Sequence, residues 1–249
     1  MYFGELQEYH FCLRDLVWIN WNLIYWEDDF LKRVVIIGAG ASGMMAAKVA
    51  GDRGYKVTVL EKQKRCGQKL LITGKGRCNI TNNCEIEELI ENVPTNGKFL
   101  YSAFYTFTND QVIDMFNDLG VETKTERGKR VFPVSDKAVD VVRALERQMN
   151  SNKNVEVLLN SKVDKIIAED GAVKKVVLSD KREIECDSVI VATGGVSYPK
   201  TGSTGDGYRF AKNLGHTIIT PKPSLIGLEV MEDYVADLAK LSLRNVSIE

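Results

Sequence analysis

Cysteine and histidine are scarce in this chain, and their pattern excludes two kinds of site. The 249 residues include five cysteines and two histidines, and the cysteines form no CxxC pair and have no histidine nearby. This pattern argues against a disulfide framework and a metal site such as zinc, and it fits a reducing, cytoplasmic compartment. The apolar run over residues 16–26 is interrupted by two asparagines and is too short to span a bilayer, so no membrane association is expected.

An excess of charge of either sign is also absent. The chain has 33 lysines and arginines against 34 aspartates and glutamates, so no overall field favours wrapping nucleic acid or binding an anionic membrane. Apolar residues make up 44% of the sequence and charged residues 27%, which is ordinary for a globular protein and excludes general disorder. The length allows one large domain or two small ones.

The first 31 residues differ in composition from the rest. Residues 1–32 hold six acids, two bases and nine of the 21 aromatic residues. Glu5 and Glu8, with no basic segment before them, argue against a secretory signal. We predict that residues 1–31 are a peripheral or non-native extension, and that Leu31 is the true start, read from a non-ATG codon.

From Lys32 onward the pattern predicts a strand, a helix and a second strand within about 30 residues. Residues 33–37 are a continuous β-branched run, typical of a strand that is covered on both faces in a parallel sheet. Residues 44–53 favour a helix that ends at Gly54, and residues 55–60 favour the second strand. This order opens a βαβ unit.

The later segments predict further elements. Residues 62–83 contain six bases, no acid and no regular period, which predicts a long functional loop. Helices are expected from Asn109, acting as the N-cap, to Gly120, and again over residues 135–149. The remaining expectations are strands over residues 155–159, 163–167 and 173–178 in hairpin-like order, a buried strand within residues 183–192, and a last helix capped by Asp206.

The pattern Gly38-x-Gly40-x-x-Gly43 follows the first predicted strand and opens a helix. Gly38 allows a tight turn, Gly40 lets backbone amides approach a pyrophosphate, and Gly43 allows close packing of helix on strand. The helix N-terminus adds N–H donors and partial positive charge. Glu61, at the tip of the second strand, would accept hydrogen bonds from an adenosine ribose and repel a 2′-phosphate. Together these features predict a dinucleotide site.

The residues alone leave the identity of the dinucleotide open. A plain NAD-binding unit continues from the acid into another helix and strand, whereas this chain inserts the basic loop over residues 62–83. Later, Thr193, Gly194 and Gly195 follow an apolar strand, where a glycine turn allows backbone to approach a cofactor. An NAD-dependent dehydrogenase and a non-catalytic nucleotide-binding fragment remain alternatives to a flavoprotein.

Five segments carry a resemblance to a known family. The sequence resembles a bacterial flavoprotein family whose members are described as aminoacetone oxidase-like, 3-dehydro-bile-acid reductase-like or ribosomal-RNA dihydrouridine synthase-like. The resemblance covers residues 32–249, and TGKGRCNITN (residues 73–82) is far more specific than the glycine pattern. The segments are VIIGAGASG (35–43), LITGKGRCNITN (71–82), VFPVS (131–135), ATGGVSYP (192–199) and GSTGDGY (202–208).

The resemblance implies an α/β fold with a Rossmann-like FAD-binding domain of the two-dinucleotide-binding-domain flavoprotein type. Residues 32–221 would form this domain without its C-terminal return, and residues 222–249 would begin a truncated, mainly β substrate domain. We therefore expect this polypeptide alone to bind FAD weakly or not at all and to need the missing C-terminal half in trans. An unpaired strand edge and apolar surface would promote association.

The resemblance also places the cofactor contacts, while no catalytic residue is assigned. Lys75 and Arg77 would lower the pKa of the Cys78 thiol, although filling a tight turn is the simpler role for this small residue. The implied FAD contacts are Gly38, Gly40, Ala41, Ser42 and Gly43 at the pyrophosphate; Glu61, Lys62 and Val163 on the adenosine side; and Gly76, Arg77, Cys78, Asn79, Thr193, Gly194 and Gly195 near the flavin.

The implied activity is that of a FAD-dependent oxidoreductase. NAD(P)H would reduce FAD, and flavin N5 would pass hydride to a C=C bond conjugated to a carbonyl. The substrate would be a small molecule or an RNA base.

Overall fold

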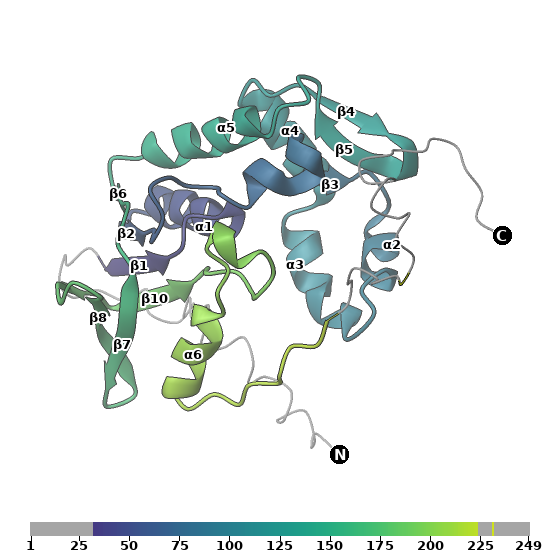
Figure 1. Cartoon of the computed structure of the whole chain (residues 1–249). Coiled ribbons are helices and arrows are strands. Elements are labelled where there is room, and N and C mark those ends of the chain that lie inside the picture. The colour runs from purple at the N-terminus through teal and green to yellow at the C-terminus, as the bar shows by residue number, and fades with distance from the viewer. Residues whose placement is uncertain (1–31, 224–230, 232–249) are drawn as a thin grey trace, which may run out of the picture. The chain divides into compact units, whose positions relative to one another are not determined.

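The computed structural model describes residues 32–223 and residue 231 (Figure 1). Two compact units divide the chain, residues 1–216 and residues 217–249, and nearly all described residues belong to the first. Residues 217–223 of the second unit form neither helix nor strand. The predicted extension over residues 1–31 and almost all of the predicted substrate domain lie outside the described residues.

A four-stranded parallel sheet forms the centre of the first unit, in the order β10-β1-β2-β6. Val35, Ile36, Val57 and Val59 are almost fully buried, as expected for β-branched residues in a sheet covered on both faces. This parallel sheet confirms the predicted Rossmann-like α/β fold. The strands are β1 (Arg33–Ile37), β2 (Lys56–Leu60), β6 (Val155–Leu158) and β10 (Ser188–Val191).

Helices α1 (Ala41–Asp52) and α5 (Ala138–Asn150) cover one face of this sheet (Figure 1). Side chains alternate along a strand, so Val34 and Ile36 of β1 join the core on this face. Met149 on α5 packs into the same core and is fully buried, which stabilises the fold by about 1.5–3 kcal/mol.

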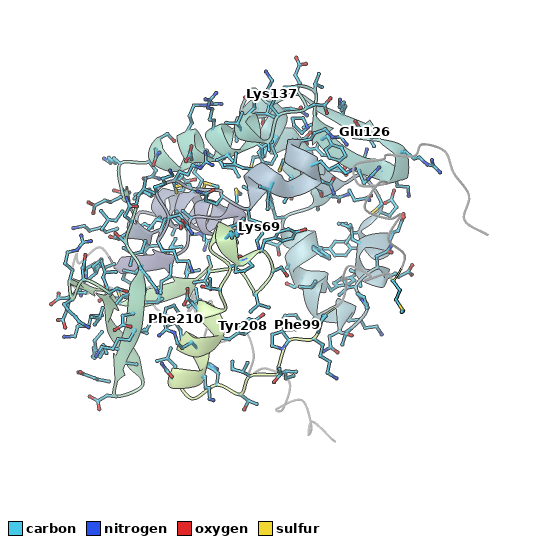
Figure 2. All side chains as sticks on the ribbon, in the orientation of Figure 1. Lys69, Phe99, Glu126, Lys137, Tyr208 and Phe210 are labelled. Atoms are coloured by element: carbon cyan, nitrogen blue, oxygen red, sulfur yellow. The ribbon has the colours of Figure 1, made fainter. Side chains whose placement is uncertain are left out.

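The opposite face of the sheet is covered by an antiparallel sheet and by α6 (Asp206–Asn213). Val35 and Ile37 of β1 point to this face, where Phe210 of α6 packs against the same core (Figure 2). The sheet order is β7-β8-β9, with β7 (Val163–Glu169), β8 (Ala172–Leu178) and β9 (Glu183–Glu185). The two faces of β1 therefore pack into two separate hydrophobic cores.

A third region lies between β2 and α5 in the chain. The segment includes the short 3₁₀ turns η1 (Leu70–Gly76), η2 (Gly97–Leu100) and η3 (Arg127–Lys129); the turn η4 (Pro199–Thr201) follows β10 later in the chain. The small sheet has the order β3-β5-β4. Its strands and the neighbouring helices are β3 (Thr81–Asn82), β4 (Thr123–Glu126), β5 (Arg130–Pro133), α2 (Ile86–Glu91), α3 (Tyr101–Thr106) and α4 (Asn109–Asp118).

Two strand predictions were wrong in their pairing. The expected hairpin order includes residues 155–159, but β6 pairs in parallel with β2, with Val155 opposite Val57. The single strand expected within residues 183–192 is two strands in different sheets, β9 and β10. The chain changes sheets between them because the Cys186 amide donates to Lys174 and the Asp187 amide donates to Arg33.

Two predicted helix caps were also wrong. Thr108, not Asn109, caps α4, and it forms a reciprocal capping box with Gln111. The Asn109 side chain is buried and donates to the carbonyls of Asn82 and Cys84. Gly205 occupies the N-cap of α6, which leaves the Asp206 carboxylate free to pair with a residue elsewhere in the chain.

No helix in residues 32–223 has the length and apolar character needed to cross a membrane.

Candidate dinucleotide-binding site

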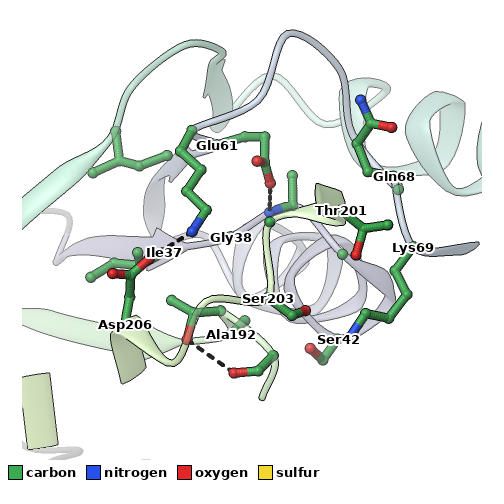
Figure 3. Close-up of a pocket in the computed structure, with 18 of the residues that line it drawn as sticks. Ile37, Gly38, Ser42, Glu61, Gln68, Lys69, Ala192, Thr201, Ser203 and Asp206 are labelled. Carbon is green, nitrogen blue, oxygen red and sulfur yellow. Dashed lines mark hydrogen bonds and ion pairs between the residues drawn. The ribbon is translucent and has the colours of Figure 1, made fainter. Parts of the chain in front are cut away.

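A cavity of about 340 Å³ opens where the carboxyl ends of β1 and β2 meet the start of α1 (Figure 3). This is the edge at which open α/β sheets bind ligands. Residues from the segment after β10 and from α6 complete the cavity wall. Nine of the predicted cofactor residues line it, namely Gly38, Gly40, Ala41, Ser42, Glu61, Lys62, Val163, Thr193 and Gly194.

Two glycines of the first turn are required by the packing of the chain itself. Gly38 has a φ of +104°, and a Cβ there would lie 2.5 Å from the Ala192 carbonyl oxygen. A Cβ on Gly43 would lie 1.8 Å from the Gly38 carbonyl oxygen. Both contacts are with backbone atoms, which cannot move cheaply. Gly38 and Gly43 therefore let α1 pack closely on the sheet, whatever the cavity holds; Gly43 itself does not line the cavity.

Gly40 is different, because the chain gives no reason for a glycine there. Its φ is −80°, which any residue adopts, and a Cβ on it would meet no described atom within 4 Å. Gly40 is also one of the residues that line the cavity. A side chain at this position would fill space that a ligand needs. The glycine is thus explained by an occupant of the cavity.

The first turn of α1 presents unpaired backbone amides to the cavity. The helix has no side-chain cap and no acid in its first turn, and its first bond runs from the Met44 amide to the Gly40 carbonyl. The amides of Ala41 and Ser42, both of which line the cavity, have no hydrogen-bond partner among the described residues. Free N–H groups and the positive end of the helix dipole favour an anionic group such as a phosphate.

The Glu61 carboxylate is held beside the turn that leads from β1 into α1. Its Oε2 accepts a hydrogen bond of 2.8 Å from the Ala39 amide, and its Oε1 accepts one of 2.8 Å from the Gln63 amide. Glu61 is only 9% exposed. Each oxygen retains a lone pair, so the carboxylate can also accept from the hydroxyls of a ribose. Figure 3 shows Glu61 fixed at the tip of β2 beside the cavity.

Lys62 also lines the cavity, but its charge is already paired. The Lys62 Nζ lies 2.6 Å from Asp206 Oδ2 and 2.6 Å from the Thr204 hydroxyl oxygen. Burial works to raise the pKa of Asp206, but hydrogen bonds from Lys62 and Thr204 outweigh it and hold that pKa below its ordinary value. Asp206, expected only to cap a helix, thus belongs to the cavity wall.

The structure does not bring the other predicted flavin contacts to the cavity. Gly76, Arg77, Cys78, Asn79 and Gly195 do not line it. The Arg77 guanidinium instead donates to Glu126 at 2.9 Å and to Asp136 at 3.3 Å, so its charge is neutralised by two carboxylates.

Arg77 also lies over the Phe132 ring, with 4.0 Å between the guanidinium carbon and the ring centroid. The hydrogen bond with Glu126 raises the pKa of Arg77 further. The Arg77 charge, which was expected to lie near a flavin, therefore holds the loop against β4 and β5.

Cys78 is a buried turn residue in this structure. Its φ is +63° and it is 1% exposed. Burial raises the pKa of its thiol, contrary to the lowering expected from Lys75 and Arg77. The expectation failed because sequence proximity placed two cations beside the thiol, whereas the fold removes the thiol from water.

The sequence reasoning missed several residues of the cavity wall. Gln68, Lys69, Thr201 and Ser203 all line it. Lys69 lies in the basic segment, residues 62–83, that the sequence predicted to be a functional loop. The sequence thus indicated the loop but did not single out Lys69 within it. Ser203 is 5% exposed, and a Cβ on Gly194 would lie only 2.7 Å from its Oγ. No sequence period marks Ser203, because only the fold brings it to the turn after β10.

Comparison with known proteins defines the class of this fold and site. Residues 32–235 match the family described as HI0933-like protein Rossmann domain. The chain is 33% identical over 211 residues to the 3-dehydro-bile acid delta(4,6)-reductase of Clostridium scindens, covering 84% of this chain and 50% of that protein. It is 31% identical over 218 residues to the ribosomal RNA dihydrouridine synthase of Haemophilus influenzae, covering 84% and 52%.

Solved structures with similar folds include a flavocytochrome and an Sdh1 complex. A flavocytochrome c3 fumarate reductase aligns with a TM-score of 0.58 and 22% identity, covering 75% of this chain and 41% of that one. Sdh1 of Mycobacterium smegmatis aligns with a TM-score of 0.57 and 21% identity, covering 74% and 39%. At these identities the likeness establishes the fold alone.

The fold and the cavity define a Rossmann-like α/β domain. The chain belongs to the HI0933-like family, and the resemblance seen in its motifs is confirmed. It spans about half the length of the curated relatives it matches.

Proposed function

We propose that the described residues bind the adenosine diphosphate part of FAD and that the chain serves a flavin-dependent oxidoreductase. The observation that carries this proposal is Gly40. It faces open cavity space with no constraint from its own chain, directly beside the unpaired amides of α1. A diphosphate supplies the acceptors that these amides lack.

The rest of the cavity fits the same ligand. Glu61 can accept from the two hydroxyls of an unphosphorylated ribose, and its charge opposes a 2′-phosphate. Val163 lines the cavity beyond Glu61, where an apolar side chain can contact an adenine ring. The cavity volume lies within the range of small-molecule sites.

The reaction we propose is NAD(P)H-driven reduction of a C=C bond conjugated to a carbonyl. Bound FAD would supply hydride transfer, and this chain's residues would hold and orient it. A delta(4,6)-reductase and a dihydrouridine synthase, the printed activities of two relatives, both concern saturation of a carbon–carbon double bond. The substrate is accordingly a small molecule or an RNA base, and a cytoplasmic location suits both.

The described residues account for only part of this activity. The relatives are about twice as long as the segment that this chain matches. We propose that residues equivalent to the unmatched part are needed for turnover, in trans if they are on another polypeptide. Binding of ADP is therefore the property expected of the described residues, with FAD bound no more tightly than ADP.

Calorimetric titration of the full chain with ADP, FAD and NAD tests the proposal. Gly40→Ala should weaken ADP binding at least about tenfold while leaving the thermal midpoint unchanged, because the added methyl group enters the cavity and meets no protein atom. Val49→Ala, an exposed change on the same helix, is the matched control and should bind ADP normally. Failure of the wild-type chain to bind ADP, or normal ADP binding by the Gly40 variant, would refute the proposal.

A second measurement separates the alternatives. Absorbance near 450 nm, roughly, reports bound flavin, and NADH oxidation is followed with and without added FAD. Turnover of NADH with a substrate in the absence of FAD would favour a plain NAD-dependent dehydrogenase. ADP binding that survives without any turnover, even when the part of the relatives that this chain does not match is supplied, would favour a non-catalytic nucleotide-binding fragment.

A further inference from the structure

Lys69 occupies a fixed position beside the first turn of α1. Its loop is tied to the turn after β1, because the Gly67 amide donates to the Ala39 carbonyl at 2.9 Å. A Cβ on Gly67 would lie 2.8 Å from the Val142 side chain, so the same loop packs closely on α5. Figure 3 shows the Lys69 side chain reaching into the cavity toward Ser42.

The charges that line the cavity leave Lys69 without a counter-ion. Lys62 is paired with Asp206, and the Glu61 carboxylate accepts from two backbone amides. Within residues 32–223, no carboxylate lies within 4.0 Å of the Lys69 amine, since none of the ion pairs found there includes it. Lys69 is half-buried, so water screens its charge only in part.

The positive charge of Lys69 is unfavourable beside the N-terminus of α1. A helix N-terminus carries partial positive charge, and a cation beside it is unfavourable. Unpaired amides and an unpaired ammonium therefore line one cavity, and its two carboxylates are already engaged, Glu61 by the Ala39 and Gln63 amides and Asp206 by Lys62. An anion in that space would satisfy both at once.

We propose that Lys69 is the cation that clamps the diphosphate of the bound nucleotide against the α1 amides. This inference rests on the proposed function and makes it more specific. The cavity then offers two chemically distinct groups, the Glu61 carboxylate for ribose hydroxyls and the Lys69 ammonium for phosphates; Lys162, an exposed lysine, also lines it. The ligand class of the cavity is a nucleoside diphosphate or a dinucleotide built on one, and a nucleoside alone uses only the carboxylate.

The two groups can be probed separately with ADP and adenosine on the full chain. Lys69→Met removes the charge but keeps an unbranched side chain, and it should weaken ADP binding about tenfold or more. Adenosine, which has no phosphate, should bind the variant as it binds the wild type. The dependence of ADP affinity on salt concentration should also fall. Lys69→Arg, which keeps the charge, should retain most of the ADP affinity.

Lys64→Met is the matched control, since Lys64 is an exposed lysine of the same loop that does not line the cavity. It removes the same net charge and should leave ADP affinity within about twofold, because exposed charges are screened by salt. Thermal unfolding of each variant checks that the fold is intact.

Each other outcome has a defined meaning. Equal losses for ADP and adenosine in the Lys69→Met protein would show a structural role and overturn the clamp. A loss of ADP affinity of the same size in the Lys64→Met protein would show that net charge, and not the position of Lys69, controls binding. That result would also overturn the clamp. If the wild type binds ADP and the Lys69→Met protein binds it equally well, this inference fails while the proposed function stands. If the wild type binds no ADP, both fail.

Discussion

The Lys62 ammonium lies 2.6 Å from the Asp206 carboxylate and so joins the tip of β2 to the first turn of α6. Both side chains are largely buried, with 21% and 17% of their surface exposed. Thr204 accepts from Lys62 and donates to Asp206, which closes a three-membered network. The pair forms part of the cavity wall, so its integrity bears on stability and on ligand binding together.

The first prediction concerns the coupling between these two residues. Lys62→Met and Asp206→Asn should each lower the free energy of unfolding, because each leaves a partly buried charge without its partner. The double variant should lose less than the sum, with a coupling energy on the order of 1 kcal/mol. Chemical denaturation of the four proteins measures this cycle. Strictly additive losses would show that the contact contributes nothing to stability.

The second prediction is a pH dependence caused by the same pair. Lys62 and Thr204 hold the pKa of Asp206 below its ordinary value of 3.8. The stabilisation is therefore complete above that ordinary value and is lost as the pH falls through the lower folded-state pKa.

Unfolding experiments from about pH 6 down to about pH 3 check this prediction. The stability difference between wild type and Asp206→Asn should shrink toward the acid end, because only the wild type loses a charge there. Asp180→Asn is the comparison variant. Asp180 also has a lowered pKa, but it pairs with Arg182 on an exposed turn and does not line the cavity. A constant difference across the pH range for Asp206→Asn would contradict the prediction.

The third prediction separates two glycines of one motif. Gly43→Ala should destabilise the protein by about 3 kcal/mol, because its Cβ would lie 1.8 Å from a backbone oxygen and push α1 away from the sheet. Gly40→Ala, the paired control, should change the unfolding free energy by less than about 0.5 kcal/mol. Thermal and chemical unfolding of both variants measures the contrast. Equal destabilisation by the two substitutions would mean that Gly40 also serves packing.

The fourth prediction concerns the reactivity of the cysteines. Burial raises the pKa of Cys66 to about 12 and that of Cys186 to about 11, and it also raises the pKa of Cys78. All three are at most 4% exposed. They should resist alkylation by iodoacetamide at about pH 8, because the thiolate is the reactive form.

Peptide mass spectrometry of the native and the urea-unfolded chain locates the modified thiols. Cys84, which is half-buried, should react faster than the three buried cysteines in the native protein, and all four should react once the chain is unfolded. Rapid labelling of Cys78 in the folded chain would contradict the structure and restore it as a candidate nucleophile.

Local pattern was sufficient for the opening unit of the fold. The β-branched run over residues 33–37 and the glycines after it predicted β1 and the turn into α1, because both depend on neighbours in sequence. The same reasoning misassigned β6, since the choice between a parallel partner and a hairpin partner depends on residues about 100 positions away. Nor did pattern divide residues 183–192 between two sheets.

The sequence by itself determined that this chain opens with a βαβ unit whose glycine turn faces a carboxylate, and its motifs determined the family. Those features are local: they need only a strand, a tight turn and an acid at the next strand's tip. Only the tertiary structure decided which charges are available. It pairs Lys62 with Asp206, turns Arg77 toward Glu126, and leaves Lys69 beside the amides of α1. Charge pairing depends on distances across the fold, and spacing along the chain does not fix them.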